Sequence, residues 1–555
     1  MRVGKEKMGE GLIRFYRTKI KKEWKTAFVA AFVIGLLIHI YKFTNTLPGH
    51  DSLYNVYSSQ NMVKLGRWFL AVACGFSTYF DLPWVIGLIS LFWIGIAAAL
   101  TADIFRMENP VLIALTGGLL VAYPAVTQTF YFEFTADGYM MAMALAAFAV
   151  RCSMIGEKRK SRLFAAFLSI VFCCGIYQAY LSFALVLALC YFMAELLENR
   201  YGKKEYILWM RNQILLYGAG VAAYYVIWKL ALLFQGVRPS PYLGIAQVGQ
   251  IGPAAFLNAV LEMAKAFFSA FAVWNFLEKG LTVYTILNML FLLLCAATVA
   301  AAMVKSRLFA GKTRLGLFLL SGAAIPFAAF IWFFASPGTQ YSTRMEQSVC
   351  LLYILTAVLL NRWVKPKLSS LAALFLAVII LHNGITANLF YQYVHRCYER
   401  SYGIGVEIAT RIHLLDHGDI TSIMVVGETD WFDKEEYEGA SGLRELGPLK
   451  YVHRDLFSAG NTYSTLFLSE IVGVELSYYR EHPEVEIPPV DFSSQPQWPV
   501  PDSWEWRFPM TDFETYQKLA DSEQVSQMGC WPAADAIQVI DHVAVVKLSE
   551  TGKEE

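Results

Sequence analysis

Long apolar runs are the feature that most constrains what this chain can fold into. Along the first 391 of its 555 residues, runs of about 18–23 mostly apolar residues recur, each long enough to cross roughly 30 Å of hydrocarbon. A single soluble core stops growing near 250–300 residues, so these runs do not fit one large soluble domain. The sequence therefore predicts a polytopic α-helical membrane protein with about eleven transmembrane helices, near residues 26–43, 84–105, 110–127, 138–156, 163–179, 181–197, 213–235, 281–304, 315–335, 348–361 and 369–391.

Clusters of Lys and Arg predict which loops face the cytoplasm. They occur in the basic N-terminal segment and in four loops: "EKRKSR" (157–162), "ENRYGKKEYILWMR" (198–211), "KSRLFAGKTR" (305–314) and "NRWVKPK" (361–367). No small-residue cleavage site follows the run at 26–43, so we expect that first helix to be retained. Eleven crossings of the cell membrane then place the N-terminus in the cytoplasm and the C-terminal segment outside.

Two further apolar stretches, 62–80 and 254–278, do not fit as crossings. Counting either one alone would reverse the sidedness of the later basic loops. Each also carries charge within the run (Arg67 in the first, Glu262 and Lys265 in the second), which is unfavourable in hydrocarbon. We expect both to be amphipathic helices at the outer interface.

The composition changes after residue 391, where roughly two-thirds of the 45 acidic residues lie. The segment at 401–416 is typical of an amphipathic helix, and "ITSIMVVGE" (420–428) and "IQVIDHVAVVKLSE" (537–550) are typical of strands. The sequence thus divides into a cytoplasmic segment (1–25), a membrane domain (26–391) and a small extracytoplasmic α/β domain (392–555). In an oxidising compartment Cys397 and Cys530 could form a disulfide or remain two thiols, and the sequence leaves both open.

Ionisable and aromatic residues gather in the loops predicted to be external. Ionisable residues beside a membrane bundle are functional candidates. A carboxylate can take a proton from an attacking hydroxyl, arginines can hold a phosphate, and aromatic rings stack on sugars. Together these residue types favour a sugar–phosphate substrate. Structural alternatives remain for three of them: Asp81 as a helix cap, Glu346 as a partner of Arg344, and Arg238 as a loop charge.

Four separated stretches occur in an order that resembles a known family. They are "HDSLYNVYSSQNMVKLGRWF", "STYFDLPWVIGLIS", "FYFEFTADGYMMAMALAAFAV" and "CCGIYQAYLSFALVL". They are similar to the bacterial type II Gtr glucosyltransferase family over about residues 25–390. This resemblance implies the GT-C class of membrane glycosyltransferases, which use a polyprenyl-phosphate-linked sugar outside the membrane. It also implies an acid in the first external loop.

The resemblance also implies roles for particular residues. Asp51 matches the first-loop acid, with Asp137 as a second catalytic carboxylate that also lines the sugar pocket. Arg67 and Arg344 are expected to bind the donor phosphate. The residues expected to bind sugar or acceptor are His50, Asp81, Tyr139, Tyr177 and Gln178. The expected reaction moves a hexose, glucose in the first instance, from undecaprenyl-phosphate-hexose to a cell-surface glycan.

Other functions are left open by the sequence. A lipid-linked oligosaccharide flippase would also be polytopic, although it favours charges at the bundle midplane over charges at the outer edge. A membrane-anchored binding module would place function in residues 392–555. A divalent cation near Asp51 and Asp137 is not excluded, but there is no dedicated metal-ligand motif, and no phosphate-binding glycine loop or nucleic-acid signature is present.

Overall fold

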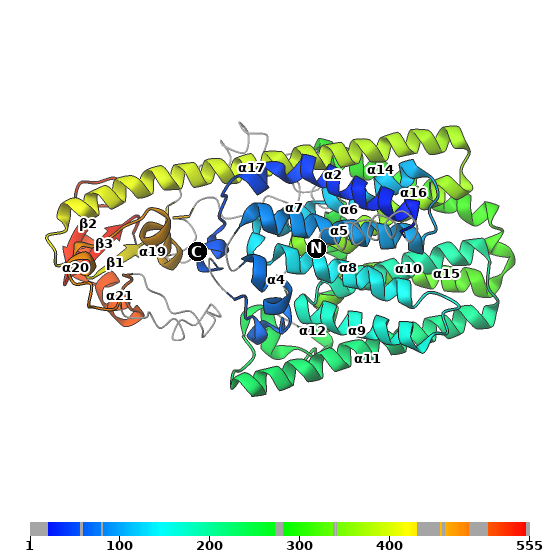
Figure 1. Ribbon diagram of the computed structural model, residues 1–555, viewed down its shortest axis with the longest axis horizontal. Helices are drawn as coiled ribbons and strands as arrows, with labels where there is room; N and C mark the ends of the chain where they lie inside the picture. The colour runs from blue at the N-terminus through cyan, green and yellow to red at the C-terminus, as the bar shows by residue number, and fades with distance from the viewer. Residues whose placement is uncertain are drawn as a thin grey trace, which may run out of the picture. The chain divides into compact units, whose positions relative to one another are not determined.

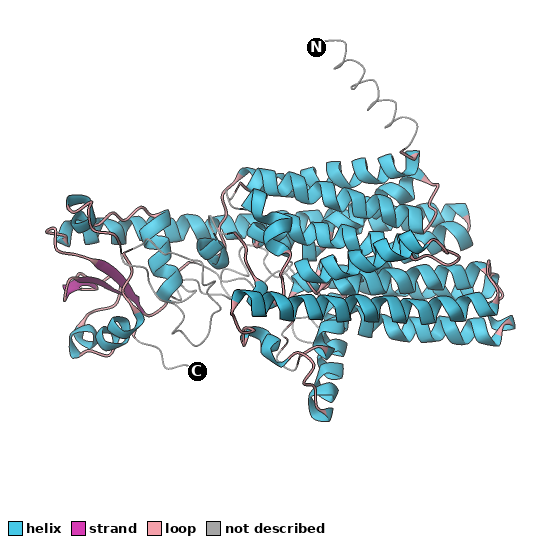
Figure 2. Cartoon of the chain, turned by 60° about the horizontal axis from the view of Figure 1, so that its bottom comes forward, coloured by secondary structure: helices cyan, strands magenta, loops and turns pink. Residues whose placement is uncertain are grey.

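The computed structural model describes residues 20–55, 59–78, 82–271, 281–336, 339, 341–429, 456–457, 461–487 and 509–550. The chain separates into two compact units (Figures 1 and 2). The first comprises Met1–Asn45, Ser59–Asn388 and Glu445–Leu449, and the second comprises Thr46–Ser58, Leu389–Arg444 and Lys450–Glu555. The second unit therefore includes a short segment from the first predicted external loop.

The first unit is a helical bundle, and every predicted crossing overlaps a helix, the last of which continues into the second unit. These are α2 (Lys22–Thr44), α5 (Pro83–Ile104), α6 (Pro110–Ala122), α7 (Pro124–Tyr131), α8 (Ala136–Cys152), α9 (Lys160–Ile176), α10 (Tyr180–Glu198), α11 (Lys203–Gln235), α14 (Val283–Lys305), α15 (Lys312–Ala329), α16 (Cys350–Trp363) and α17 (Pro366–Leu415). Proline occupies the first turn of α5, α6 and α7, where its fixed φ suits a helix start and its missing N–H is not needed.

Close backbone packing joins α2 to its neighbours α5 and α6. A Cβ on Gly117 of α6 would lie only 2.8 Å from the backbone nitrogen of Ala31 on α2. Inside a membrane the hydrophobic effect does not drive helices together, because no water is expelled between them. Membrane helices associate instead through such close contact between small residues. The pair α2–α6 therefore depends on glycine at position 117.

Six of the described helices are long and apolar enough to cross a membrane: α2, α5, α10, α11, α14 and α17. The pair α6–α7, bent by 41°, makes a seventh if it is one broken span. The other predicted crossings correspond to α8 and α9 with 17 residues each, α15 with 18 and α16 with 14. The chain is thus a helical membrane protein, and the total of about eleven crossings stays a prediction.

The two stretches expected at the interface contain α4 (Leu70–Thr78) and α12 (Pro253–Ala270). In α12 the buried side chains are Ala259, Met263, Ala266 and Ala270, which form one stripe at helical spacing. Leu257 and Leu261 are exposed on the other side. This distribution fits an amphipathic helix, whose position at the interface remains a prediction.

The second unit contains a three-stranded sheet in the order β1–β3–β2. β1 (Ser422–Val426) pairs in parallel with β3 (Val543–Lys547), and β2 (Ile537–Ile540) pairs antiparallel with β3. The segment predicted as one strand over 537–550 is therefore a hairpin. Its two turn residues, Asp541 and His542, have φ of 48° and 65°, as a tight type I′ turn requires.

Both faces of this sheet are buried. Ile423 and Val425 face a core with the end of α17 and with α19 (Asn461–Leu466), whereas Met424 and Val426 face α21 (Phe513–Ala520) and α22 (Glu523–Gln527). This alternation follows from the two-residue period of a strand. The first core also contains Leu53, from α3 (His50–Asn55), so the acid-bearing loop folds as part of this unit.

Two cysteines lie in the second unit, Cys397 on α17 and Cys530 before β2. No disulfide joins them. Cys397 is buried, and the Cys530 thiol donates a weak hydrogen bond to Glu550 over 3.7 Å. Of the two alternatives left by the sequence, the structure has separate thiols.

Candidate functional site

Arg67 lies over a pair of stacked tyrosines in the first unit. Its Nη1 donates a hydrogen bond of 2.8 Å to the Tyr139 hydroxyl, and its Cζ lies 4.8 Å from the ring centroid of Tyr177. The Tyr139 and Tyr177 rings are parallel within 7° and 4.1 Å apart. Three residues predicted from separate motifs thus form one cluster, in which a cation is fixed over aromatic faces.

The turn that presents Arg67 depends on Gly66. Gly66 has φ of +79°, a conformation that L side chains rarely adopt, and its Cβ would lie 2.4 Å from Gln178 Nε2. Gln178 Nε2 donates to the Leu65 carbonyl oxygen at 3.0 Å and to the Tyr224 hydroxyl at 2.8 Å. Gln178, predicted to bind sugar, therefore braces the Arg67 turn, and its contact with sugar stays a prediction.

Arg344 is held by α7. Its backbone N–H donates to Gln128 Oε1 at 2.6 Å, and its guanidinium Cζ lies 4.1 Å from the Phe132 ring centroid. Arg344 thus lies against α7, and its role as a second phosphate ligand with Arg67 stays a prediction.

Asp137 lies in the first turn of α8 and is only 2% exposed. Its carboxylate accepts hydrogen bonds from the Ser77 hydroxyl on α4 and from the Gly138 N–H at 2.9 Å. The positive end of the helix dipole favours a carboxylate at this position. Asp137 thus links α4 to α8 beside Tyr139, and its catalytic role stays a prediction.

A buried ion pair supports the same region. Lys42, in the last turn of α2, lies 2.7 Å from Glu133, which is in the short 3₁₀ turn Glu133–Thr135 between α7 and α8. Their side chains are 2% and 4% exposed. Burial raises the pKa of Glu133, and the Lys42 charge opposes that rise. Sequence analysis did not select Lys42, although a lysine ending an apolar helix was a usable signal.

Glu346, two residues after Arg344 in the sequence, is a third buried carboxyl group. It has no exposed surface, and it accepts a hydrogen bond from the Tyr341 hydroxyl, in place of the suggested pairing with Arg344. Burial raises the pKa of Glu346 to about 8. At neutral pH much of this group is therefore protonated and carries little negative charge.

Asp51 and His50 belong to the second unit. His50 Nε2 lies 3.4 Å from Asp51 Oδ1, and the Tyr463 hydroxyl donates to the same oxygen at 3.3 Å. The Asp51 side chain is 28% exposed, so it is more accessible than Asp137. An accessible carboxylate is better suited to receive a substrate proton. Asp81, also predicted from the motifs, lies outside the described residues.

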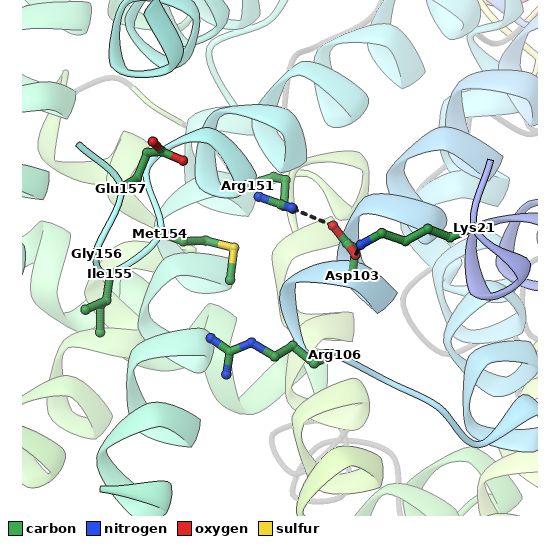
Figure 3. A pocket seen from close by; sticks show the side chains of 8 residues that line it. All are labelled: Lys21, Asp103, Arg106, Arg151, Met154, Ile155, Gly156 and Glu157. Carbon is green, nitrogen blue, oxygen red and sulfur yellow. Dashed lines mark hydrogen bonds and ion pairs between the residues drawn. The ribbon is translucent and has the colours of Figure 1, made fainter. Parts of the chain in front are cut away.

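A pocket of about 340 Å³ lies at the other ends of α2, α5 and α8 (Figure 3). Its acid Asp103 pairs with Lys21 and with Arg151, each at 2.5 Å, and Arg106 pairs with Glu195 at 2.8 Å. None of its lining residues is aromatic: Lys21, Asp103, Arg106, Arg151, Met154, Ile155, Gly156 and Glu157. These mutually paired charges fasten helix ends together and do not resemble a sugar site.

In the part of the chain that the structure describes, no three His, Cys, Asp or Glu side chains are grouped so that they could hold a metal ion. The candidate residues of the first unit are Arg67, Asp137, Tyr139, Tyr177 and Arg344, and those of the second unit are His50 and Asp51.

Comparison with known proteins assigns the family. No curated protein and no solved structure matches the chain. A family model described as glucosyl transferase GtrII matches residues 40–345, more than half of the 555 residues, and this range includes every candidate site residue. The resemblance of the four motifs is thereby confirmed. The chain belongs to the GtrII glucosyl transferase family and is a membrane-embedded glycosyltransferase.

Proposed function

We propose that this glycosyltransferase moves a hexose, glucose in the first instance, from a polyprenyl-phosphate-linked donor to a cell-surface glycan at the outer face of the membrane. The observation that carries the proposal is the cluster of Arg67, Tyr139 and Tyr177. Guanidinium groups suit a phosphate, and aromatic faces suit a sugar ring. A lipid-linked donor fits a site built among membrane helices.

The proposed reaction is a displacement at the anomeric carbon. The acceptor oxygen forms a bond to C1 of the hexose, the bond from C1 to the phosphate oxygen breaks, and the acceptor proton passes to Asp51. The phosphodiester donor carries one negative charge, and the departing polyprenyl phosphate monoester carries a second. Arg67 and Arg344 stabilise this added charge, which develops in the transition state.

The other assigned residues bind substrates in this proposal. Asp137, Tyr139, Tyr177 and Gln178 line the sugar pocket, with Asp137 as the second catalytic carboxylate. His50 and Asp81 are assigned to the acceptor side.

Transfer from synthetic polyprenyl-phosphate-glucose by the purified full-length protein in sealed lipid vesicles tests the proposal. Asp51→Asn keeps the side-chain shape but cannot accept the proton, so turnover should fall by a factor of about 10²–10⁴. Asp419→Asn, at an exposed aspartate of the same unit, is the matched control and should keep full activity. Normal turnover in Asp51→Asn would remove the assigned base, and lipid translocation without transfer would favour a flippase.

Donor binding tests the phosphate site separately. Arg67→Ala and Arg344→Ala should each weaken binding of the labelled donor lipid by about 1.5–3 kcal/mol for every charged hydrogen bond removed. Acceptor binding should change less. Normal donor binding in both variants would place the phosphate elsewhere, with Arg238 or Lys265 as the next candidates.

A further inference from the structure

The segment that carries Asp51 folds with the C-terminal part of the chain. Residues Thr46–Ser58 belong to the second unit, and α3 packs against α19. Leu53 of α3 is 2% exposed and lies in one core with Leu466 and Phe467. The family match ends at residue 345, so this supporting core comes from a part of the chain that the match does not cover.

Two side chains of the second unit approach one oxygen of Asp51. The Tyr463 hydroxyl on α19 donates to Oδ1 at 3.3 Å, and His50 Nε2 lies 3.4 Å from the same atom. The Tyr463 and His50 rings meet edge to face, 5.3 Å apart at 82°. Tyr463 is itself 4% exposed, so its ring is fixed by packing. Such a fixed donor restricts the orientation of the carboxylate it contacts.

We propose that Tyr463 is a positioning residue for the transferase reaction and that the C-terminal unit thereby forms part of the catalytic machinery. Tyr463 and His50 both contact Oδ1 and thereby fix the orientation of the Asp51 carboxyl group. This inference rests on the proposed role of Asp51 as the base. It assigns the C-terminal unit a function in the transfer step, in place of a function as an independent binding module.

The variant Tyr463→Phe tests this role because it removes only the hydroxyl and retains the ring that packs on His50. We expect kcat to fall about tenfold, equivalent to about 1.4 kcal/mol, with the KM for donor unchanged. Tyr479→Phe is the matched control, since its hydroxyl donates to the Thr421 carbonyl oxygen at 3.1 Å in the same unit. This control should keep normal kcat.

A double variant separates positioning from a general structural effect. If Tyr463 acts through Asp51, adding Tyr463→Phe to Asp51→Asn should lower the residual turnover no further. Full additivity of the two losses, or normal kcat in Tyr463→Phe, would overturn the inference. The proposed function fails differently, by normal turnover in Asp51→Asn alone, so the two failures can be told apart. Equal melting temperatures of wild type and Tyr463→Phe check that the fold is retained.

Discussion

Replacing Lys42 by methionine should destabilise the bundle strongly, because it leaves the Glu133 carboxylate buried without its cation. The two side chains are 2% and 4% exposed and 2.7 Å apart. Removing one member of such a buried pair costs about 3–5 kcal/mol, whereas replacing both by uncharged residues of similar volume is often neutral. We therefore expect a loss of about 3–5 kcal/mol in Lys42→Met and recovery of most of it in Lys42→Met/Glu133→Gln.

The pH dependence of this loss follows from the raised pKa of Glu133. The folded state holds the proton more tightly than the unfolded state, whose carboxyl titrates near 4.3, so stability falls as pH rises between the two pKa values. Without Lys42 the folded pKa should rise further. The destabilisation of Lys42→Met should then be small below pH 4 and fully present once the pH exceeds the pKa of Glu133 in the folded variant.

Unfolding free energies measured by SDS titration in mixed micelles provide the assay. Wild type, Lys42→Met, Glu133→Gln and the double variant form a cycle that isolates the coupling between the two residues. A loss below about 1 kcal/mol in Lys42→Met would refute the reasoning. So would a double variant as unstable as that single variant, since the effect would then come from lost packing and not from an unpaired charge.

Two further predictions concern the Arg67 turn and the sidedness of the loops. Gly66→Ala should weaken donor binding because its Cβ would meet Gln178. Gly236→Ala is the control: Gly236 has φ of +68° and no described atom within 4 Å of its Cβ, so this variant should show only backbone strain. Equal donor affinities in the two variants would contradict this prediction. In a background without native cysteines, a membrane-impermeant thiol reagent should label intact cells carrying Gln250→Cys but not Ser161→Cys, both exposed positions, and the reverse pattern would overturn the topology.

The sequence predicts the helices well because apolar runs report burial directly. It also selects Arg67, Tyr139, Tyr177 and Arg344, since unusual residues beside apolar runs are visible without a structure. Their mutual contacts are not visible, because Tyr139 lies 72 positions after Arg67 and 38 positions before Tyr177, and residues so far apart have no periodic relation. Asp541 and His542, two polar residues that form the turn, indicate a hairpin in the sequence, although the composition of the segment indicates only a strand.

Most features that the sequence does not reveal depend on an interaction partner far away along the chain. Lys42 lies within the predicted crossing at 26–43, and nothing local shows that Glu133 neutralises it. Gln178 lies in a motif that suggests substrate binding, yet its amide donates a hydrogen bond to the backbone of the Arg67 turn. Leu53 is an ordinary apolar loop residue in the sequence, and only the structure shows that it joins the core of a distant segment.

The pairing of α3 with α19 has a consequence for biosynthesis. Asp51 and Tyr463 are 412 residues apart, so at about 5–20 residues per second the ribosome needs roughly 20–80 s to make the second after the first. During that interval the membrane helices can insert while the loop that contains Leu53 still lacks its core. On the proposed role of Asp51, a chain interrupted before residue 461 would enter the membrane normally and yet be unable to transfer sugar.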